Sequence, residues 1–233
     1  MVLYRFLYPI VNWLARVAAR VTVTGTEHMP RVGGVLLVSN HLSNYDPMIV
    51  AMCFKRILHF MGKAELYRNP VLRWICLQLQ TFPVRRGEVD RAALRYAEEL
   101  LRGGRIVAVF PEGHRSRSGG MQAAQGGIAL LARRTGVPIL PVAITGTQYL
   151  WPPALLRWRL WRRPDITITI GEPFTLPRAG HAGNTAQTDL IMARVAALLP
   201  PDYHGVYAVA SAPAEEDADR AVAETEAEEQ VGS

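Results

Sequence analysis

The sequence has 233 residues, of which 49% are hydrophobic and 20% charged, which argues against a disordered chain and for one main globular domain with a substantial core. The formal net charge of +6 is unevenly divided: residues 211–233 hold eight acidic residues against one basic residue, so residues 1–210 carry +13. A body this basic favours anionic partners, such as phosphorylated substrates, anionic lipids or nucleic acid.

The first segment of the chain, residues 1–20, is apolar but too short to cross a bilayer, because its longest uncharged run covers residues 6–15 and contains a proline. Apolar residues recur at three- and four-residue spacing, at Leu3, Phe6, Leu7, Ile10, Leu14, Val17 and Val21. Three arginines lie outside this stripe. The segment can therefore be an amphipathic helix in a membrane interface, or one packed on the domain.

Strand-like and helix-like segments alternate along the next part of the chain, residues 21–210. Strands are expected at 21–24, 33–39, 57–61, 82–84, 105–110, 137–144 and 166–170. Helices are expected at 47–58, 69–79, 91–101, 128–134 and 189–199. The alternation predicts an α/β domain with a central, largely parallel sheet flanked by helices. In such sheets, binding sites gather beyond the carboxyl ends of the strands.

Two features of the chain predict little chemistry. Cys53 and Cys76 stand in apolar helical surroundings without the spacing of metal ligands, so we expect two buried thiols and no metal site. The acidic tail, residues 211–233, is rich in Ala and Glu and has no aromatic residue, so we expect it to be disordered.

Polar residues follow the expected strand 33–39 directly. His41 and Asp46 lie in one strand-to-helix loop, immediately before Pro47. Imidazole can take up a proton near neutral pH, and a carboxylate on its other nitrogen would orient it, so the loop could hold a general base. The same residues also suit a purely structural role, with Asp46 as the helix N-cap and Pro47 in the first turn.

Four segments, in order along the chain, resemble motifs of the glycerolipid acyltransferases, above all the 1-acylglycerol-3-phosphate acyltransferases. They are Asn40-His41-x4-Asp46, Lys63-Ala64-Glu65-Leu66 with Val84-Arg85-Arg86-Gly87, Phe110-Pro111-Glu112-Gly113-His114-Arg115-Ser116, and Val137-Pro138-Ile139-Leu140-Pro141-Val142. The resemblance runs from about residue 24 to about residue 171. His114 stands where the family usually has Thr, Arg85 where it has an acid, and Gln125 where it often has a lysine.

The resemblance implies a role for each motif. His41 would deprotonate the hydroxyl of an acyl acceptor and Asp46 would orient the imidazole, with a thiolate as leaving group. The acceptor is 1-acylglycerol 3-phosphate and the product phosphatidic acid. The candidates for binding its phosphate are Lys63, Arg86 and Arg115, and Glu112 with Gly113 would form an acceptor-binding turn. No metal or cofactor is implied; acyl-CoA or acyl carrier protein would be the co-substrate.

The second membrane signal lies at residues 151–163, where tryptophans alternate with arginines: Trp151, Arg157, Trp158, Arg159, Trp161, Arg162 and Arg163. Such residues hold peripheral proteins at lipid headgroups, although a solvated basic loop with core tryptophans fits as well. We expect a peripheral protein on the cytoplasmic face of the cell membrane, with membrane lipid as partner and no nucleic acid, since no nucleic-acid module is recognisable. The oligomeric state stays open.

Other functions remain compatible with the sequence. The acceptor could be glycerol 3-phosphate or another lysophospholipid, because the motifs bind a glycerol phosphate without specifying its other substituent. A thioester or lipid hydrolase would use the same base with water in place of the acceptor. A protein that binds anionic lipid or nucleic acid without catalysis would use the basic body and would not need His41.

Overall fold

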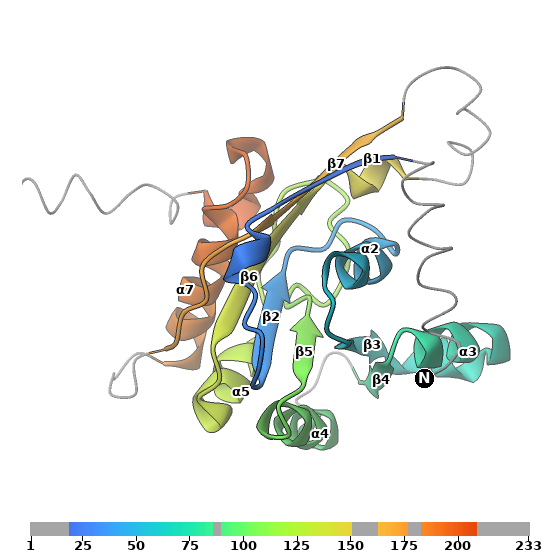
Figure 1. The fold of residues 1–233 in the computed structure, drawn as a ribbon, viewed down its shortest axis with the longest axis vertical. Helices are drawn as coiled ribbons and strands as arrows, with labels where there is room; N and C mark the ends of the chain where they lie inside the picture. The colour runs from blue at the N-terminus through green and yellow to red at the C-terminus, as the bar shows by residue number, and fades with distance from the viewer. Residues whose placement is uncertain (1–18, 86–89, 151–162, 177–182, 209–233) are drawn as a thin grey trace, which may run out of the picture.

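A computed structural model describes residues 19–85, 90–150, 163–176 and 183–208, which form a seven-stranded sheet with helices on both faces (Figure 1). The strands are β1 (Arg20–Thr24), β2 (Val35–Ser39), β3 (Leu58–Lys63), β4 (Thr81–Val84), β5 (Ile106–Val109), β6 (Ile139–Thr145) and β7 (Asp165–Ile170). The α-helices are α2 (Asp46–Cys53), α3 (Pro70–Gln78), α4 (Arg91–Arg102), α5 (Gly127–Thr135) and α7 (Asn184–Ala196). Short 3-10 helices are η1 (Thr26–His28), η2 (Ala64–Arg68), η3 (Thr147–Tyr149), η5 (Pro201–Tyr203) and η6 (Gly205–Tyr207).

The strands follow the order β1-β7-β6-β2-β5-β3-β4 across the sheet. Neighbouring strands are parallel except β6 and β7, which run antiparallel. The prediction of a largely parallel sheet flanked by helices is therefore confirmed. β2 lies in the middle between β6 and β5, so the loops that leave the carboxyl ends of these three strands meet at one edge of the sheet.

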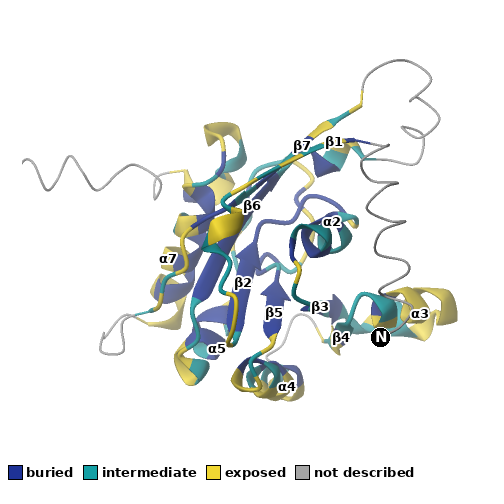
Figure 2. Ribbon diagram, viewed as in Figure 1, coloured by how far each residue is buried: buried dark blue, intermediate teal, exposed yellow. Residues whose placement is uncertain are grey.

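The core has two layers, one on each face of the sheet. Leu36 and Val38 of β2 face the cluster that includes α4, α5 and α7, while Val35 and Leu37 face the cluster that includes α2. This alternation follows from the two-residue period of a strand. Because both faces are covered, all five residues of β2 are buried, and Figure 2 shows the central strands in dark blue. The His41 loop therefore begins at a residue, Ser39, that is packed on both sides.

Two expected helices differ from those observed. The helix expected to reach Leu58 ends at Cys53, because Phe54 is already extended and Leu58 begins β3. The closing helix begins at Asn184, five residues before the expected start. Several expectations lie outside the described residues: the helical stripe of residues 1–18, Arg86, the tryptophans and arginines of residues 151–162, and the tail 211–233. Among the described residues, no helix has the length and apolarity to span a membrane.

Candidate active site

The site lies at the carboxyl ends of β2 and β5. These strands are parallel neighbours, with Val38 opposite Val109, so the loops that follow them leave the sheet side by side. The first loop carries His41 and the second carries Glu112, and the two loops are hydrogen-bonded to each other. The sequence predicted that both loops follow strands directly, and the structure brings them together.

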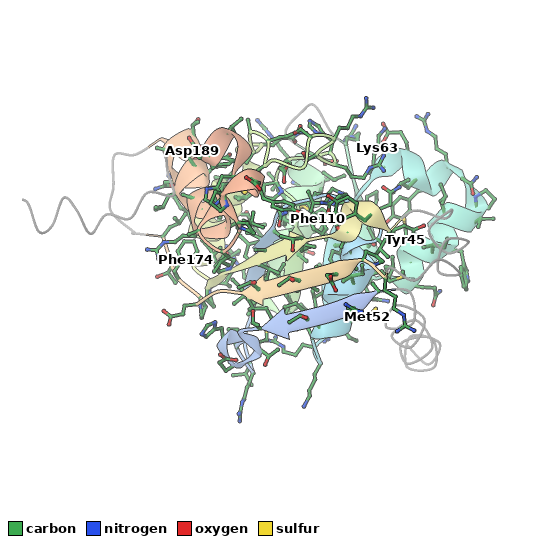
Figure 3. The ribbon with its side chains drawn as sticks, turned by 90° about the horizontal axis from the view of Figure 1, so that it is seen from above. Tyr45, Met52, Lys63, Phe110, Phe174 and Asp189 are labelled. Carbon is green, nitrogen blue, oxygen red and sulfur yellow. The ribbon has the colours of Figure 1, made fainter. Side chains whose placement is uncertain are left out.

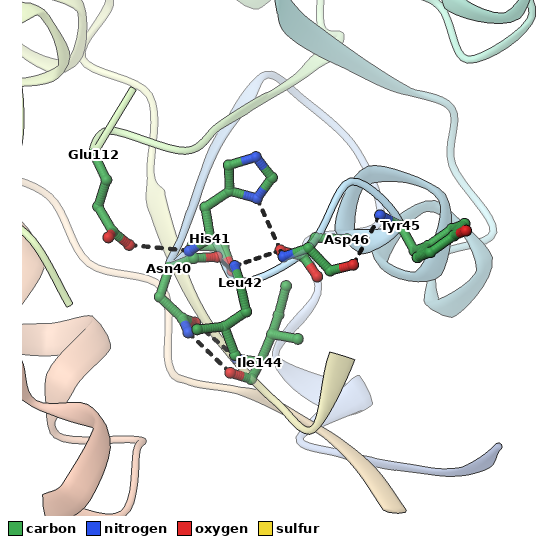
Figure 4. Close-up of polar contacts among 9 residues, drawn as sticks. Asn40, His41, Leu42, Tyr45, Asp46, Glu112 and Ile144 are labelled. Carbon is green, nitrogen blue, oxygen red and sulfur yellow. Dashed lines mark hydrogen bonds and ion pairs between the residues drawn. The ribbon is translucent and has the colours of Figure 1, made fainter. Parts of the chain in front are cut away.

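His41 and Asp46 form a hydrogen-bonded pair. Nδ1 of His41 lies 2.8 Å from Oδ2 of Asp46 (Figure 4). The aspartate is fully buried, while the histidine side chain keeps 11% of its surface exposed. The carboxylate therefore fixes the proton on Nδ1 and leaves Nε2 as the nitrogen that can accept one. Within the described part of the chain, Nε2 makes no hydrogen bond that would compete for this lone pair.

Asp46 does not cap its helix. The N-cap of α2 is Tyr45, whose own side chain makes no capping hydrogen bond. Instead, Oδ2 of Asp46 accepts hydrogen bonds from the backbone N–H groups of Leu42 and Ser43, each at 2.7 Å, in addition to the hydrogen bond from the imidazole Nδ1–H of His41. The carboxylate thus folds the loop back on itself and holds the imidazole at the same time. The purely structural alternative, in which Asp46 serves as N-cap, does not describe this geometry.

The histidine backbone is anchored to the Glu112 loop. The N–H of His41 donates to Oε1 of Glu112 at 3.0 Å, and its C=O accepts from the N–H of Ser116 at 2.8 Å. The imidazole stacks on Phe110, with ring centroids 4.3 Å apart and planes inclined by 23°. The ring therefore has one fixed orientation, set by the carboxylate at its edge and by the aromatic ring on its face.

Glu112 is a buried carboxylate whose partners are backbone amides. Its Oε1 accepts from His41 and its Oε2 accepts from the N–H of Gln122 at 3.0 Å. Burial raises its pKa to about 7, although the two amides favour the ionised form, and the negative charge of Asp46 acts in the same direction as burial. Glu112 makes no ion pair with Arg115 among the described contacts, so its observed role is to join the two loops.

Gly113 gives the second loop its tight turn. It has φ +72°, in the left-handed region, and its N–H donates to the carbonyl of Phe110 at 3.1 Å. A Cβ at this position would lie 2.5 Å from Nε2 of Gln125. A side chain here would be strained by the positive φ and would displace the end of the Gln125 side chain, so glycine suits the turn that the resemblance assigns to acceptor binding.

The candidate phosphate-binding residues lie around the same edge but are held less firmly. Lys63 ends β3 and forms a loose contact of 3.7 Å with Glu65, and both side chains are nearly half exposed. Arg115 is exposed and directly precedes Ser116, whose amide is bonded to His41. Seen from above in Figure 3, Lys63 and Tyr45 lie on the opposite side of the molecule from Asp189 and Phe174, and Phe110 lies between the two groups.

Arg86, the remaining phosphate candidate, lies outside the described residues, but the strand before it is placed. Val84, the last residue of β4, is paired with Lys63. Arg85 follows β4 and forms an ion pair of 3.5 Å with Asp90. The chain therefore leaves β4 at the same edge of the sheet, beside Lys63.

Asn40 has a role that the sequence did not reveal. Its side-chain amide donates to the carbonyl of Ile144 at 2.9 Å and accepts from the N–H of Ile144 at 2.8 Å. These two bonds tie the start of the loop to β6, on the other side of β2 from Glu112 (Figure 4). Asn40 belonged to the motif, but only its partner 104 residues away shows what it does. Phe110 was likewise part of a motif without an assigned role.

The site resembles a general-base centre. A neutral histidine held by a buried carboxylate can remove a proton from a hydroxyl at Nε2, and the cations around it can bind an anionic group. Across the ranges described, no group of three or more His, Cys, Asp or Glu residues could hold a metal ion. The fold and this pair together define an α/β protein with a histidine–aspartate pair at the carboxyl edge of its sheet.

The chain belongs to the Acyltransferase family, whose model matches residues 20–145, more than half of its length. The 1-acyl-sn-glycerol-3-phosphate acyltransferase of Borreliella burgdorferi is 30% identical over 149 residues, which are 63% of this chain and 59% of that protein. The enzyme of the same name from Pseudomonas aeruginosa is 33% identical, over 61% of this chain and 56% of that protein. Each match therefore spans less than two thirds of the relative's length.

Two further relatives bear on the fold and the acceptor. The crystal structure of the 1-acyl-sn-glycerophosphate acyltransferase PlsC from Thermotoga maritima superposes with a TM-score of 0.62 at 26% identity, covering 82% of this chain and 78% of that one. A lyso-ornithine lipid O-acyltransferase of Pseudomonas aeruginosa is 35% identical, over 57% of this chain and 52% of that protein. Both the fold and the family expected from the sequence motifs are confirmed.

Proposed function

We propose that the protein transfers a fatty acyl group from an acyl thioester to the free hydroxyl of 1-acylglycerol 3-phosphate, giving phosphatidic acid. The observation that carries the proposal is the 2.8 Å bond between His41 and the buried Asp46 at the carboxyl edge of the sheet, in a chain that belongs to the Acyltransferase family. Relatives named for this reaction support the choice of acceptor.

The pair supplies the chemistry that such a transfer needs. Nε2 of His41 takes the proton of the acceptor hydroxyl while the oxygen attacks the thioester carbonyl. The tetrahedral intermediate then collapses, the C–S bond breaks, and the thiolate leaves and recovers a proton. Asp46 stabilises the imidazolium that forms in between. A positioned base of this kind contributes roughly 10² to 10⁴ in rate.

The cations supply recognition. Lys63, Arg86 and Arg115 would bind the phosphate of the acceptor, and guanidinium groups suit phosphate because they donate two parallel hydrogen bonds. Glu112 and Gly113 would shape the turn against which the glycerol lies, with Glu112 acting through the His41 backbone that it holds. Binding the phosphate at the rim and the hydroxyl at His41 would orient the acceptor for attack.

A different lysolipid is the second candidate acceptor. It is favoured by the similarity to a protein named for a lyso-ornithine lipid acceptor. Glycerol 3-phosphate is the third candidate acceptor. The donor would be acyl-CoA or acyl carrier protein. We place the protein on the cytoplasmic face of the cell membrane, where lysophosphatidic acid, being amphipathic, would meet it.

The test is acceptor-dependent release of thiol from a long-chain acyl-CoA, with lysophosphatidic acid, glycerol 3-phosphate, a lyso-ornithine lipid or no acceptor. The proposal predicts release with lysophosphatidic acid and little with the others. Release without any acceptor would identify a hydrolase, and release only with another acceptor would replace the proposed one. If acyl-CoA is inert with all of them, acyl carrier protein is the donor to try, and silence with both donors contradicts a transferase.

A further inference from the structure

One short helix carries half of the large apolar side chains that stand exposed in the described part of the molecule. On α3 these are Val71 at 64% exposure, Leu72 at 40%, Trp74 at 51%, Ile75 at 41% and Leu77 at 50%. The remaining ones are scattered singly over other elements. Only Cys76 of this helix is buried, and Figure 2 shows α3 largely in yellow at the periphery of the molecule. An apolar patch of this kind marks an interaction surface.

The pattern of α3 is that of a helix with an outward-facing apolar stripe. Val71, Trp74 and Ile75 stand at positions i, i+3 and i+4, so they share one face. Asn69 caps the helix by accepting from the N–H groups of Val71 and Leu72 at 2.9 and 3.1 Å. The exposed stripe is therefore carried by a properly formed and capped helix.

The charged residues on α3 and directly before its N-cap are of one sign. α3 contains no acidic residue, and Arg73 on the helix and Arg68 just before it are both exposed. A tryptophan among apolar residues, with arginines whose stems can extend toward phosphate, fits an anionic lipid headgroup layer. A protein partner would need directional polar contacts at its rim, and Arg73 and Gln78 are the polar side chains that α3 presents.

The helix is also connected directly to the candidate site. Lys63 ends β3, η2 follows at once, and α3 begins two residues after η2. A membrane at α3 would therefore lie next to the cation that is a candidate for binding the acceptor phosphate.

We propose that α3 docks on an anionic lipid bilayer, inserting Val71, Trp74 and Ile75 among the headgroups while Arg68 and Arg73 contact lipid phosphates. This surface is separate from the two sequence segments, 1–20 and 151–163, that were expected to meet the membrane. The docking of α3 is independent of the proposed function. The inference rests on that function in one respect, namely that the docked bilayer would lie beside a site for a lipid acceptor.

The test is flotation of the full-length chain with vesicles of phosphatidylcholine and phosphatidylglycerol. Trp74→Ser should lower the partition coefficient by about tenfold or more, because a large apolar side chain is lost from the lipid interface while the charge is unchanged. The matched control is Val32→Ser, an even more exposed apolar residue at 83% that lies before the central strand β2 and not on α3. It should leave binding unchanged. Equal binding of Trp74→Ser and wild type would overturn the proposal.

Two further outcomes would also overturn it. If Trp74→Ser lowers the melting temperature markedly and leaves flotation unchanged, α3 is covered by the chain itself. If wild type is a dimer by sedimentation and Trp74→Ser a monomer, with flotation unchanged, the occupant is a second copy.

Activity distinguishes this proposal from the proposed function. Trp74→Ser should keep wild-type transfer to a short-chain lysophosphatidic acid dissolved as monomers and lose transfer to the same headgroup presented in vesicles. If the wild type transfers acyl groups to neither acceptor, but its flotation with vesicles is reduced by Trp74→Ser, the proposed function is wrong and the docking surface stands. If it transfers to both and Trp74→Ser floats like wild type, the function stands and the docking surface is wrong.

Discussion

The His41 loop and the candidate phosphate-binding cations differ in how the structure holds them. His41 and Asp46 are buried, and hydrogen bonds hold their loop to Ile144 of β6 and to Glu112 in the loop after β5. Arg115 is exposed, and Lys63 has a long contact of 3.7 Å with Glu65. The fold therefore positions the His41–Asp46 pair before substrate binds, whereas Lys63 and Arg115 would be ordered by the bound phosphate.

The difference follows from what each group must do. A general base needs one tautomer and one orientation before the substrate arrives, and burial with several hydrogen bonds provides both. A phosphate-binding cation must stay hydrated until a phosphate replaces the water, so exposure suits it. Substitutions in the His41 loop should therefore reduce kcat, whereas substitutions of the candidate phosphate-binding cations should reduce the affinity for the acceptor.

The largest effect is expected for Asp46→Asn. The amide oxygen can still accept from Leu42 and Ser43, but the negative charge that stabilises the imidazolium is lost. We expect kcat to fall by about 10³-fold or more with a small change in the KM for acceptor. Steady-state thiol release at varied acceptor concentration measures both constants. A loss confined to KM would mean that Asp46 belongs with the cations and not with the base.

The second-largest effect is the contribution of Glu112 to the pH dependence of the free energy of unfolding. Its pKa is raised from 4.5 to about 7 in the folded chain, so folding favours the protonated form. Below pH 4.5 Glu112 is protonated in both states and does not destabilise the folded chain. As the pH rises through about 7, the free energy of unfolding falls by up to about 3 kcal/mol. Urea unfolding of wild type and Glu112→Gln at several pH values measures it.

The glutamine variant sharpens that measurement. Gln has one acceptor oxygen for the two amides of His41 and Gln122, so the variant should be less stable at low pH by about 1–3 kcal/mol. The difference between the two proteins should then narrow as the pH rises. A difference that is constant from pH 4 to pH 8 would contradict a raised pKa of Glu112.

The smallest effect is expected for Arg115→Ala. Losing one charge-assisted contact with a phosphate should raise the KM for acceptor by about 10- to 100-fold, with kcat changed much less. The side chain is exposed, so the melting temperature should stay within a degree or two of wild type. Arg117→Ala, an exposed arginine two residues further on, is the matched control. If both variants raise KM equally, the effect is one of general positive charge.

The sequence predicted the position of the site because position depends on local patterns. A buried apolar run followed by Asn40 and His41 marks the end of a strand, and parallel strands end at one edge. The alternation of segments was likewise enough to predict the layered fold. The four motifs predicted the family. Of their residues, the structure brings His41, Asp46, Phe110 and Glu112 into contact.

The contacts of the site could not be predicted, because they join distant segments. Asn40 bonds to Ile144 and Glu112 to the His41 backbone only because β2 lies between β6 and β5, and strand order is not written in any local pattern. The antiparallel pairing of β6 with β7 is hidden for the same reason. The sequence predicted the helix α3 but not the exposure of its apolar stripe, since a 3.6-residue period does not tell which side of a helix is covered.

The central claim is that His41 acts as the base, and His41→Ala tests it most directly. The measurement is lysophosphatidic acid-dependent thiol release from acyl-CoA or, if acyl-CoA is inert, from acyl carrier protein, with vesicle flotation and the melting temperature as controls. We expect thiol release to fall to background while flotation stays at the wild-type level and the protein stays folded. Turnover close to wild type in a folded His41→Ala protein would contradict the mechanism.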